Sequence, residues 1–355
     1  MNTTKMFILL AVLVGVFIIA IGVGSVNIPP GDTIRIILAR TLGIGDLYGI
    51  AATRVNIVWE IRLPRALLAF IVGAALAVSG AIMQSVLRNP LASSFTLGVS
   101  SGASMGAAFI LLAGISFAFN FASPLTGSII EINPSLPLSG FVFGMFTIII
   151  VIAMASKMDG RMDNNTIILV GMVLSLFINS ISTLLMALNQ ESAQRLIFWQ
   201  MGSFLGRGWN PVAILAPIAL LGILLALRYH RELDIMTFGE EQAQLMGINM
   251  RKIKWILLII SAAITGSAIA FVGIIGFVDL VAPHVVRRIF GSRHRLIIPL
   301  SAIFGGAFMI LCDLVARTVI SPGELPVGVV SALVGAPFFA YVYFSRGKGE
   351  RNAKA

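Results

Sequence analysis

Long apolar stretches alternate with short polar connections along most of this chain. Each stretch has about 20 residues, the length that a helix needs to cross the hydrocarbon core of a bilayer. Inside lipid, the backbone amides and carbonyls of a segment must pair within that segment, so each stretch is predicted to be helical. The pattern predicts ten spans, at residues 6–26, 64–87, 96–116, 138–156, 166–188, 211–228, 254–272, 274–290, 297–318 and 326–344.

Composition supports an all-α integral membrane protein that forms a single domain over residues 1–355. The chain is 58% hydrophobic and only 11% charged, whereas about a quarter of the residues in soluble domains are charged. The first stretch is longer than the apolar core of a secretory signal peptide, so we interpret it as a span.

The distribution of charge predicts the orientation of the chain. If the N-terminus is inside the cell, 17 of the 25 Lys and Arg residues fall on the inner side of the predicted spans. Basic residues collect on the cytoplasmic side of membrane proteins, so both termini are predicted to be cytoplasmic. The same rule accounts for the net charge of +10 without nucleic acid as a partner.

The chemistry of a nucleotide site or a metal site is missing from the sequence. There is no G-x-x-x-x-G-K-[ST] loop to hold the phosphates of ATP. His230, His284 and His294 have no second histidine at helical spacing, and Cys312 is the single cysteine. No convergent set of ionisable groups lies at membrane depth, so we expect a protein that is not an enzyme and holds no metal or cofactor.

Two carboxylates fall inside the predicted spans, Asp279 and Asp313. Arg317 follows Asp313 by four residues on the same helix face, which predicts an intramembrane ion pair between them. The sequence leaves the role of Asp279 open. Ion-coupled secondary transporters need several intramembrane charges, so this scarcity disfavours that class, which we keep as an alternative.

Two rows of small residues, with a spacing of four, begin at Gly73 and at Gly98. Small residues let helix backbones approach closely in lipid, where no hydrophobic effect drives helices together. Both rows therefore predict close helix–helix contacts.

Three stretches closely resemble the iron-siderophore/vitamin B12 permease family of type II ABC importers. Residues 62–106 read RLPRALLAFIVGAALAVSGAIMQSVLRNPLASSFTLGVSSGASMG. Residues 273–295 read GIIGFVDLVAPHVVRRIFGSRHR, and residues 313–343 read DLVARTVISPGELPVGVVSALVGAPFFAYVY. Asp279 departs from the pattern, because many members are expected to have a glycine there.

The resemblance implies a multi-pass permease subunit in the bacterial cytoplasmic membrane, with the type II ABC importer fold. It also implies a homodimer or a heterodimer with a paralogous permease, and spans five and ten as the walls of the substrate path. Two cytoplasmic ATPase subunits would bind ATP and Mg²⁺, and an extracytoplasmic binding protein would deliver the ligand. The expected cargo is a ferric siderophore, with haem or cobalamin as alternatives.

A polar segment at residues 229–253 stands out between two apolar runs. The spacing of Thr237 and Glu240 is that of a capping box, which predicts a helix beginning near residues 238–239. Gly247 suits a left-handed C-cap and ends that helix at Met246. The segment resembles the coupling helices of the family, and a solvated hairpin is the alternative. The residues expected to contact an ATPase are Thr237, Phe238, Gly239, Glu240, Glu241, Ala243, Leu245, Met246 and Gly247.

Arginines predicted on the outer side are candidates for contact with the binding protein. Arg62 and Arg65 lie on one helix face just before span two. By resemblance these two and Arg317 meet carboxylates of the binding protein, and guanidinium suits such pairing because it can bond a carboxylate bidentately. Anchoring at the lipid headgroups is the alternative.

Four further residues match positions that the family uses to close the cytoplasmic end of the path. They are Asn89, Leu91, Asn164 and Asn165. An Asn-Pro turn and a helix N-cap would explain the same residues without any gate.

Overall fold

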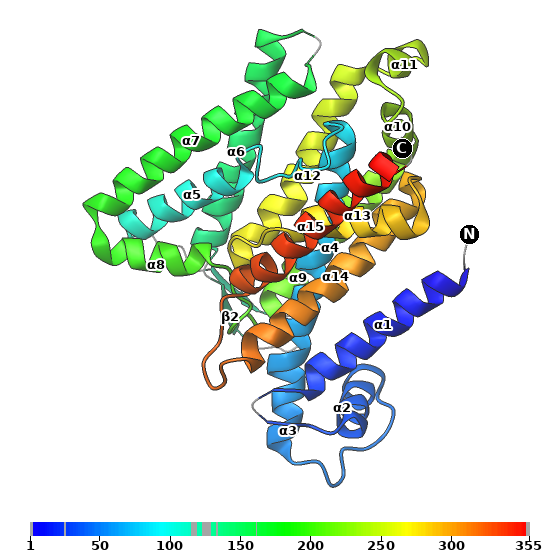
Figure 1. Cartoon of the computed structure of the whole chain (residues 1–355). Coiled ribbons are helices and arrows are strands. Elements are labelled where there is room, and N and C mark those ends of the chain that lie inside the picture. Colours follow the sequence, from blue (N-terminus) through cyan, green and yellow to red (C-terminus); the bar gives the residue numbers. More distant parts are fainter. Residues whose placement is uncertain are drawn as a thin grey trace.

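The computed structural model describes residues 3–24, 26–114, 119–122, 129–132, 134–160 and 162–352 of the chain. Its regular elements are helices apart from one antiparallel hairpin, in which Phe119 of β1 pairs with Ile132 of β2. The long helices form a bundle, and both chain ends lie toward the end that carries α10 and α11 (Figure 1). The hairpin and α3 lie at the other end of the bundle.

Each of the ten predicted spans coincides with a helix, which confirms the all-helical membrane fold. In the described residues, seven helices are long and apolar enough to cross a membrane, and one of them runs continuously over Ala52–Val86. The ten elements are α1 (Thr3–Gly22), α4 (Leu63–Val86), α5 (Val99–Ala113), α6 (Ser135–Met158), α7 (Asn164–Leu188), α9 (Trp209–Arg228), α12 (Met250–Val272), α13 (Val278–Phe290), α14 (His294–Thr318) and α15 (Val327–Asn352).

The apolar pattern did not predict the shorter elements between the spans. Most are polar or amphipathic and too short to cross a bilayer, so a search for long apolar runs passes over them. They are α2 (Pro30–Leu42), α3 (Ala52–Asn56), the π-helix η1 (Ile57–Arg62), α8 (Gln190–Gln200), α10 (His230–Met236), α11 (Glu240–Leu245), β1 (Phe119–Ala122) and β2 (Ile129–Ile132).

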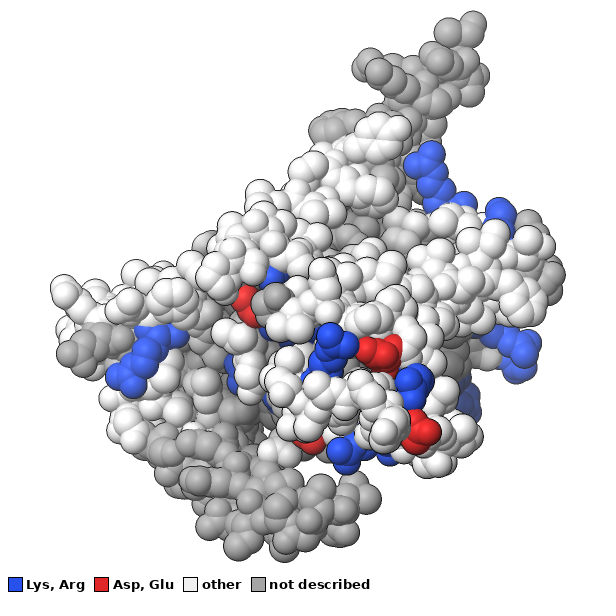
Figure 2. Space-filling model, turned by 90° about the horizontal axis from the view of Figure 1, so that it is seen from below, with Lys and Arg blue, Asp and Glu red and all other residues white. Residues whose placement is uncertain are grey.

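Among the described residues, both signs of charge occur at the end of the bundle that carries α2 and α3. Figure 2 looks at this end and shows basic and acidic side chains next to one another. Two of the ion pairs are Arg35 with Asp46 at 2.8 Å and Arg54 with Asp32 at 3.2 Å. Exposed pairs of this kind contribute little stability.

α4 is the central helix, because α9, α12, α13 and α14 all pack around it. Its glycines permit this: a Cβ on Gly73 would lie 2.2 Å from the carbonyl oxygen of Gly305 in α14. A Cβ on Gly80 would lie 1.8 Å from the carbonyl oxygen of Asp279 in α13. The row that begins at Gly98 packs against α6 in the same way, since a Cβ on Gly102 would meet Thr147 at 2.2 Å. Both rows of small residues therefore make the predicted close contacts.

Asp279, whose role the sequence left open, is fully buried at the crossing of α13 with α4. Its backbone carbonyl accepts a hydrogen bond of 3.2 Å from Nε2 of Gln84 in α4. The crossing therefore combines a backbone contact at Gly80 with a side-chain bond one turn further along α4.

Replacement of Gly80 by alanine tests the packing of α4 on α13. The added methyl group has no room, and overpacking of a tight contact destabilises a protein by about 1–3 kcal/mol. We therefore expect Gly80→Ala to lower the thermal unfolding temperature of the detergent-solubilised protein. Gly266→Ala is the matched control in α12, because its Cβ would have no neighbour closer than 3.6 Å. Equal unfolding temperatures for the two variants would contradict this description of the crossing.

Candidate functional site

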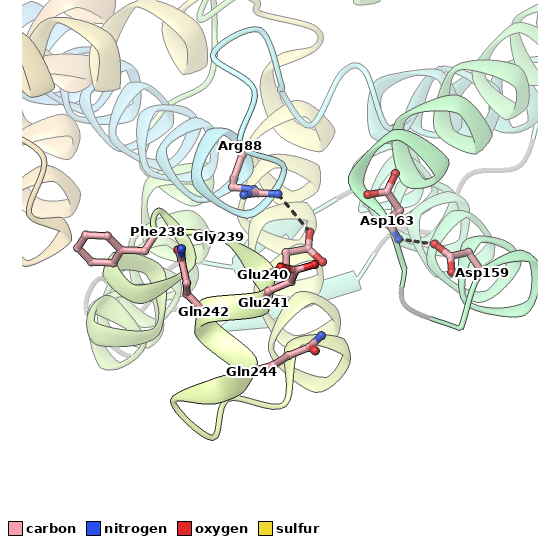
Figure 3. Close-up of a pocket in the computed structure, with 9 residues that line it drawn as sticks. All are labelled: Arg88, Asp159, Asp163, Phe238, Gly239, Glu240, Glu241, Gln242 and Gln244. Carbon is pink, nitrogen blue, oxygen red and sulfur yellow. Dashed lines mark hydrogen bonds and ion pairs between the residues drawn. The ribbon is translucent and has the colours of Figure 1, made fainter.

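A cavity of about 610 Å³ opens at the end of the bundle that carries α10 and α11 (Figure 3). Its walls come from the C-terminal end of α4, from the turn between α6 and α7, and from α11. The lining residues are Arg88, Asp159, Asp163, Phe238, Gly239, Glu240, Glu241, Gln242 and Gln244. Most of the residues predicted to contact an ATPase therefore lie on one wall of this cavity or next to it.

The start of α11 was predicted at the right place but for the wrong reason. The helix begins at Glu240 after Gly239, and no side chain caps it. The hydroxyl of Thr237 instead donates a hydrogen bond of 2.6 Å to the carbonyl oxygen of Asp234, at the end of α10. The capping-box interpretation is wrong because Thr237 is the C-cap of α10, with right-handed helical backbone angles. The turn into α11 is made by Gly239, at φ 126°.

The end of α11 agrees with the sequence. Gly247 has φ 83° and follows the last turn of the helix. Its amide donates to the carbonyl of Gln244 at 2.9 Å, and the amide of Ile248 donates to the carbonyl of Ala243 at 3.0 Å. These two bonds form a Schellman motif, which requires a left-handed residue at the position of Gly247.

Large apolar side chains in α11 and at its two ends are exposed. Leu245 is 88% exposed, Phe238 68% and Met246 61%, while Ala243 is buried beneath them. A helix of six residues is not stable by itself in water, so its position depends on contacts with the rest of the protein. Exposed apolar side chains that cluster on such a helix are typical of a contact surface for another protein.

Glu240 fixes α11 to the bundle. Its Oε1 accepts a hydrogen bond of 2.8 Å from Nζ of Lys254 in α12, and Nη2 of Arg88 lies 4.0 Å from the same oxygen. Sequence reasoning placed both basic residues on the inner side but missed this contact. Lys254 lies 14 positions from Glu240 and Arg88 lies much further away, so no local spacing could indicate it.

The four candidate gate residues lie in two separate turns. Oδ1 of Asn89 accepts a hydrogen bond of 2.9 Å from the amide of Leu91, as in an Asn-Pro turn. Asn164 is buried at the start of α7, whereas Asn165 is exposed. The N-cap of α7 is Asp163, which accepts from the amide of Asn165 at 3.3 Å. No hydrogen bond among the described residues joins the two turns, and the gate stays a prediction.

At the opposite end of the bundle, Arg65 forms two bidentate ion pairs. Its guanidinium donates to Asp313 at 2.8–3.1 Å and to Glu324 at 2.9 Å, and both Arg65 and Asp313 are buried. Nε of Arg317 lies 3.6 Å from Oδ2 of Asp313, so the ion pair that their four-residue spacing predicted is present. The sequence did not indicate that Arg65, from another helix, would make the shorter contacts with Asp313.

The other two candidate docking arginines also have partners within the chain. Arg62 donates to the carbonyl oxygens of Ile21 and Gly22 at 2.9 and 2.8 Å, and Arg317 donates to that of Ala20. These carbonyls end α1, so the arginines hold the end of α1 against η1 and α14. A cavity of about 180 Å³ lies beside the three arginines. Their docking role stays a prediction.

Removal of the Arg65 side chain tests how far this cluster stabilises the fold. Loss of one partner leaves buried charges uncompensated, and such a change typically costs about 3–5 kcal/mol. We expect Arg65→Met to lower the free energy of unfolding by an amount of this order. Arg40→Met, at an exposed arginine of α2, is the control and should change it little. A small effect from Arg65→Met would mean that the cluster does not carry stability.

Comparison with known proteins agrees with this architecture. The FecCD transport family profile matches residues 10–345. The uncharacterized ABC transporter permease protein YvrB of Bacillus subtilis is 38% identical over 94% of this chain and 92% of its own length. The cobalamin import system permease protein BtuC of Halobacterium salinarum is 36% identical, over 84% of this chain and 76% of its own.

Two further comparisons cover most of the chain. The Fe(3+)-citrate import system permease protein YfmD of Bacillus subtilis is 34% identical over 86% of this chain and 89% of its own. A solved structure assigned to a metal-chelate type ABC transporter, in an inward-facing conformation, superposes with a TM-score of 0.81 at 27% identity. That match covers 97% of this chain and all of the other. The chain belongs to the FecCD transport family and is a non-catalytic, multi-pass permease subunit of an ABC importer in the cytoplasmic membrane.

Proposed function

We propose that this permease imports a ferric siderophore that an extracytoplasmic binding protein delivers. In this proposal α11 is the surface that receives the cytoplasmic ATPase subunits, and both chain termini are cytoplasmic. Membership of the family already places ATP binding in separate subunits. The surface that receives them and the identity of the ligand are the parts that we propose.

The observation that carries this proposal is the exposed apolar surface of α11. Leu245 of this short helix is exposed, as are Phe238 just before it and Met246 just after it. Glu240 fixes the helix to the bundle through Lys254. A permease without its own nucleotide site must be moved by its ATPase. The surface that does this has to be accessible to the ATPase and connected to the transmembrane helices. α11 meets both conditions, because its tip is exposed while its first residue bonds to a long, largely buried helix.

We place α11 on the cytoplasmic side of the membrane because of the charges around it. The end of the bundle with α11 carries several basic residues, and basic residues collect on the cytoplasmic side of membrane proteins. They are Arg88, Arg231, Arg251, Lys252 and Lys254. The binding protein would then meet the opposite end, where α2, α3 and the Arg65 cluster lie.

A ferric chelate is favoured as cargo by the relative whose name includes ferric citrate import and by the metal-chelate type of the similar structure. Cobalamin is the second candidate, because a relative of comparable identity is a cobalamin import permease. Haem is a further alternative.

We also propose a dimer, either of two copies or with a paralogous permease. α7 exposes a row of large apolar side chains that the described helices leave uncovered, among them Leu169, Val173 and Leu176. α15 exposes Leu333 and Phe338. By resemblance these two helices line the substrate path between the subunits, and the remaining outward apolar surface contacts lipid.

Transport by the reconstituted importer tests the proposed cargo. Proteoliposomes that contain the permease, its ATPase and its binding protein should accumulate an iron-labelled siderophore only when ATP is present. Cobalamin and haem are offered in parallel as competing ligands. Uptake of either one without uptake of the siderophore would assign the cargo to that ligand. Uptake driven by an ion gradient in the absence of an ATPase would contradict the proposal as a whole.

Replacement of Gly247 tests the role of α11. Valine is β-branched and strongly disfavoured at φ 83°, so Gly247→Val should break the turn that positions the end of the helix. We expect transport to fall about tenfold, equivalent to about 1.4 kcal/mol of coupling, while ATP hydrolysis continues. Gly206→Val is the matched control, because it introduces a similar strain at φ 67° in the connection between α8 and α9, also in open space. This variant should keep transport coupled to ATP hydrolysis. Full uptake by Gly247→Val would refute the assignment of α11.

A further inference from the structure

A buried lysine in α12, Lys254, connects α11 to the turn between α6 and α7. Lys254 lies in the second turn of α12 and is completely buried, which is rare for a lysine side chain. Its Nζ donates a hydrogen bond of 2.8 Å to Oε1 of Glu240 in α11. It donates a second bond of 2.6 Å to the carbonyl oxygen of Met162. One ammonium group therefore connects α12, α11 and the turn between α6 and α7.

The turn at Met162 has an unusual backbone. Met162 has φ 53°, a left-handed conformation that residues other than glycine seldom adopt, and its side chain is completely buried. Such a conformation persists only where surrounding contacts enforce it. The bond from Lys254 to the Met162 carbonyl is one of those contacts. α7 begins two residues later, at Asn164, so the position of this turn sets where α7 starts.

Glu240 lies between two cations, Lys254 in α12 and Arg88 just after α4. Besides Lys254, Arg88 at the end of α4 lies 4.0 Å from Oε1 of Glu240, and Figure 3 shows these two side chains directed toward each other. Asp159 and Asp163, on the turn between α6 and α7, lie on the other side of the cavity in the same view. The cavity of about 610 Å³ thus separates α11 from that turn and leaves room for one to move relative to the other.

We propose that Lys254 is a positioning residue that makes α11 and the α6–α7 turn move as one unit. A displacement of α11 would then pass through Glu240 and Lys254 to Met162, and from there to the first residues of α7. The proposal rests on the proposed function only in that an ATPase supplies the displacement. The link itself is a property of this chain and can be measured in the permease alone.

Distances between spin labels test this link. The labels are attached at Gln244→Cys on α11 and Gly160→Cys in the α6–α7 turn, both exposed, in a Cys312→Ser background. The protein is studied in lipid nanodiscs, first alone and then in complex with its ATPase, with and without ATP. We expect one narrow distance distribution in every state, because the two labelled segments move together.

Two substitutions at position 254 and one control make the test specific. Lys254→Met keeps an unbranched side chain but loses both hydrogen bonds, so it should broaden the distribution and let ATP shift its mean. Lys254→Arg retains donors for both acceptors and should restore the narrow distribution. Lys252→Met removes an exposed lysine two residues earlier in the same helix and should change nothing. An unchanged distribution in Lys254→Met, or equal broadening in Lys252→Met, would overturn the proposal.

Transport by the complex provides a second readout. Lys254→Met should transport about tenfold less substrate per ATP hydrolysed, within the usual range of coupling between sites, and Lys254→Arg should recover most of it. If Lys254→Met does not fold, Glu240→Gln removes the charge of the same pair and decides the question by the label distances. Failure of the unsubstituted permease to bind an ATPase would contradict the proposed function instead, while the distances in the permease alone still test the link.

Discussion

The close backbone contacts along α4 determine how the rest of the molecule is arranged. Apolar side chains gain little from leaving lipid, so helices associate in a membrane by close packing. Gly73 and Gly80 let α14 and α13 reach the backbone of α4 on the two halves of its length. The result is a buried central helix whose two ends lie at opposite ends of the bundle. Each end carries an arginine with a distinct set of partners.

At one end, Arg65 joins α4 to Asp313 in α14 and to Glu324 in the connection that leads to α15. Arg62 and Arg317 add bonds to the last carbonyls of α1. At the other end, Arg88 faces Glu240 of α11. α4 thus runs between a polar cluster at one end and a short, exposed helix at the other. In the proposed coupling, the bond from Lys254 to Met162 connects α11 to the start of α7.

Features that depend on local sequence could be predicted. The ten helices at the predicted spans follow from the apolar runs, and the turn at Gly247 follows from the need for a left-handed residue after α11. The family could be recognised because its motifs are contiguous. The start of α11 shows the limit of local rules, since Thr237 has the right spacing for a cap but its hydroxyl bonds to the preceding helix.

Contacts between distant parts of the chain could not be predicted. Arg65 lies 248 positions from Asp313, and Lys254 lies 92 positions from Met162. No periodicity indicates which of several charged groups will meet when helices pack. The spacing of Asp313 and Arg317 indicated one contact but could not show that Arg65 approaches the same carboxylate more closely. The docking and gating roles depend on other subunits, so the fold of one chain leaves both as predictions.

Photo-crosslinking from the tip of α11 tests most directly whether this helix receives the ATPase. A photoreactive phenylalanine derivative replaces Leu245, the most exposed of its apolar side chains, in the assembled importer. A second variant carries the same group at Tyr48, which is 90% exposed at the opposite end of the bundle. Our account predicts a crosslink to the ATPase subunit from position 245 and none from position 48. An intact complex that gives no ATPase crosslink from position 245 would contradict it.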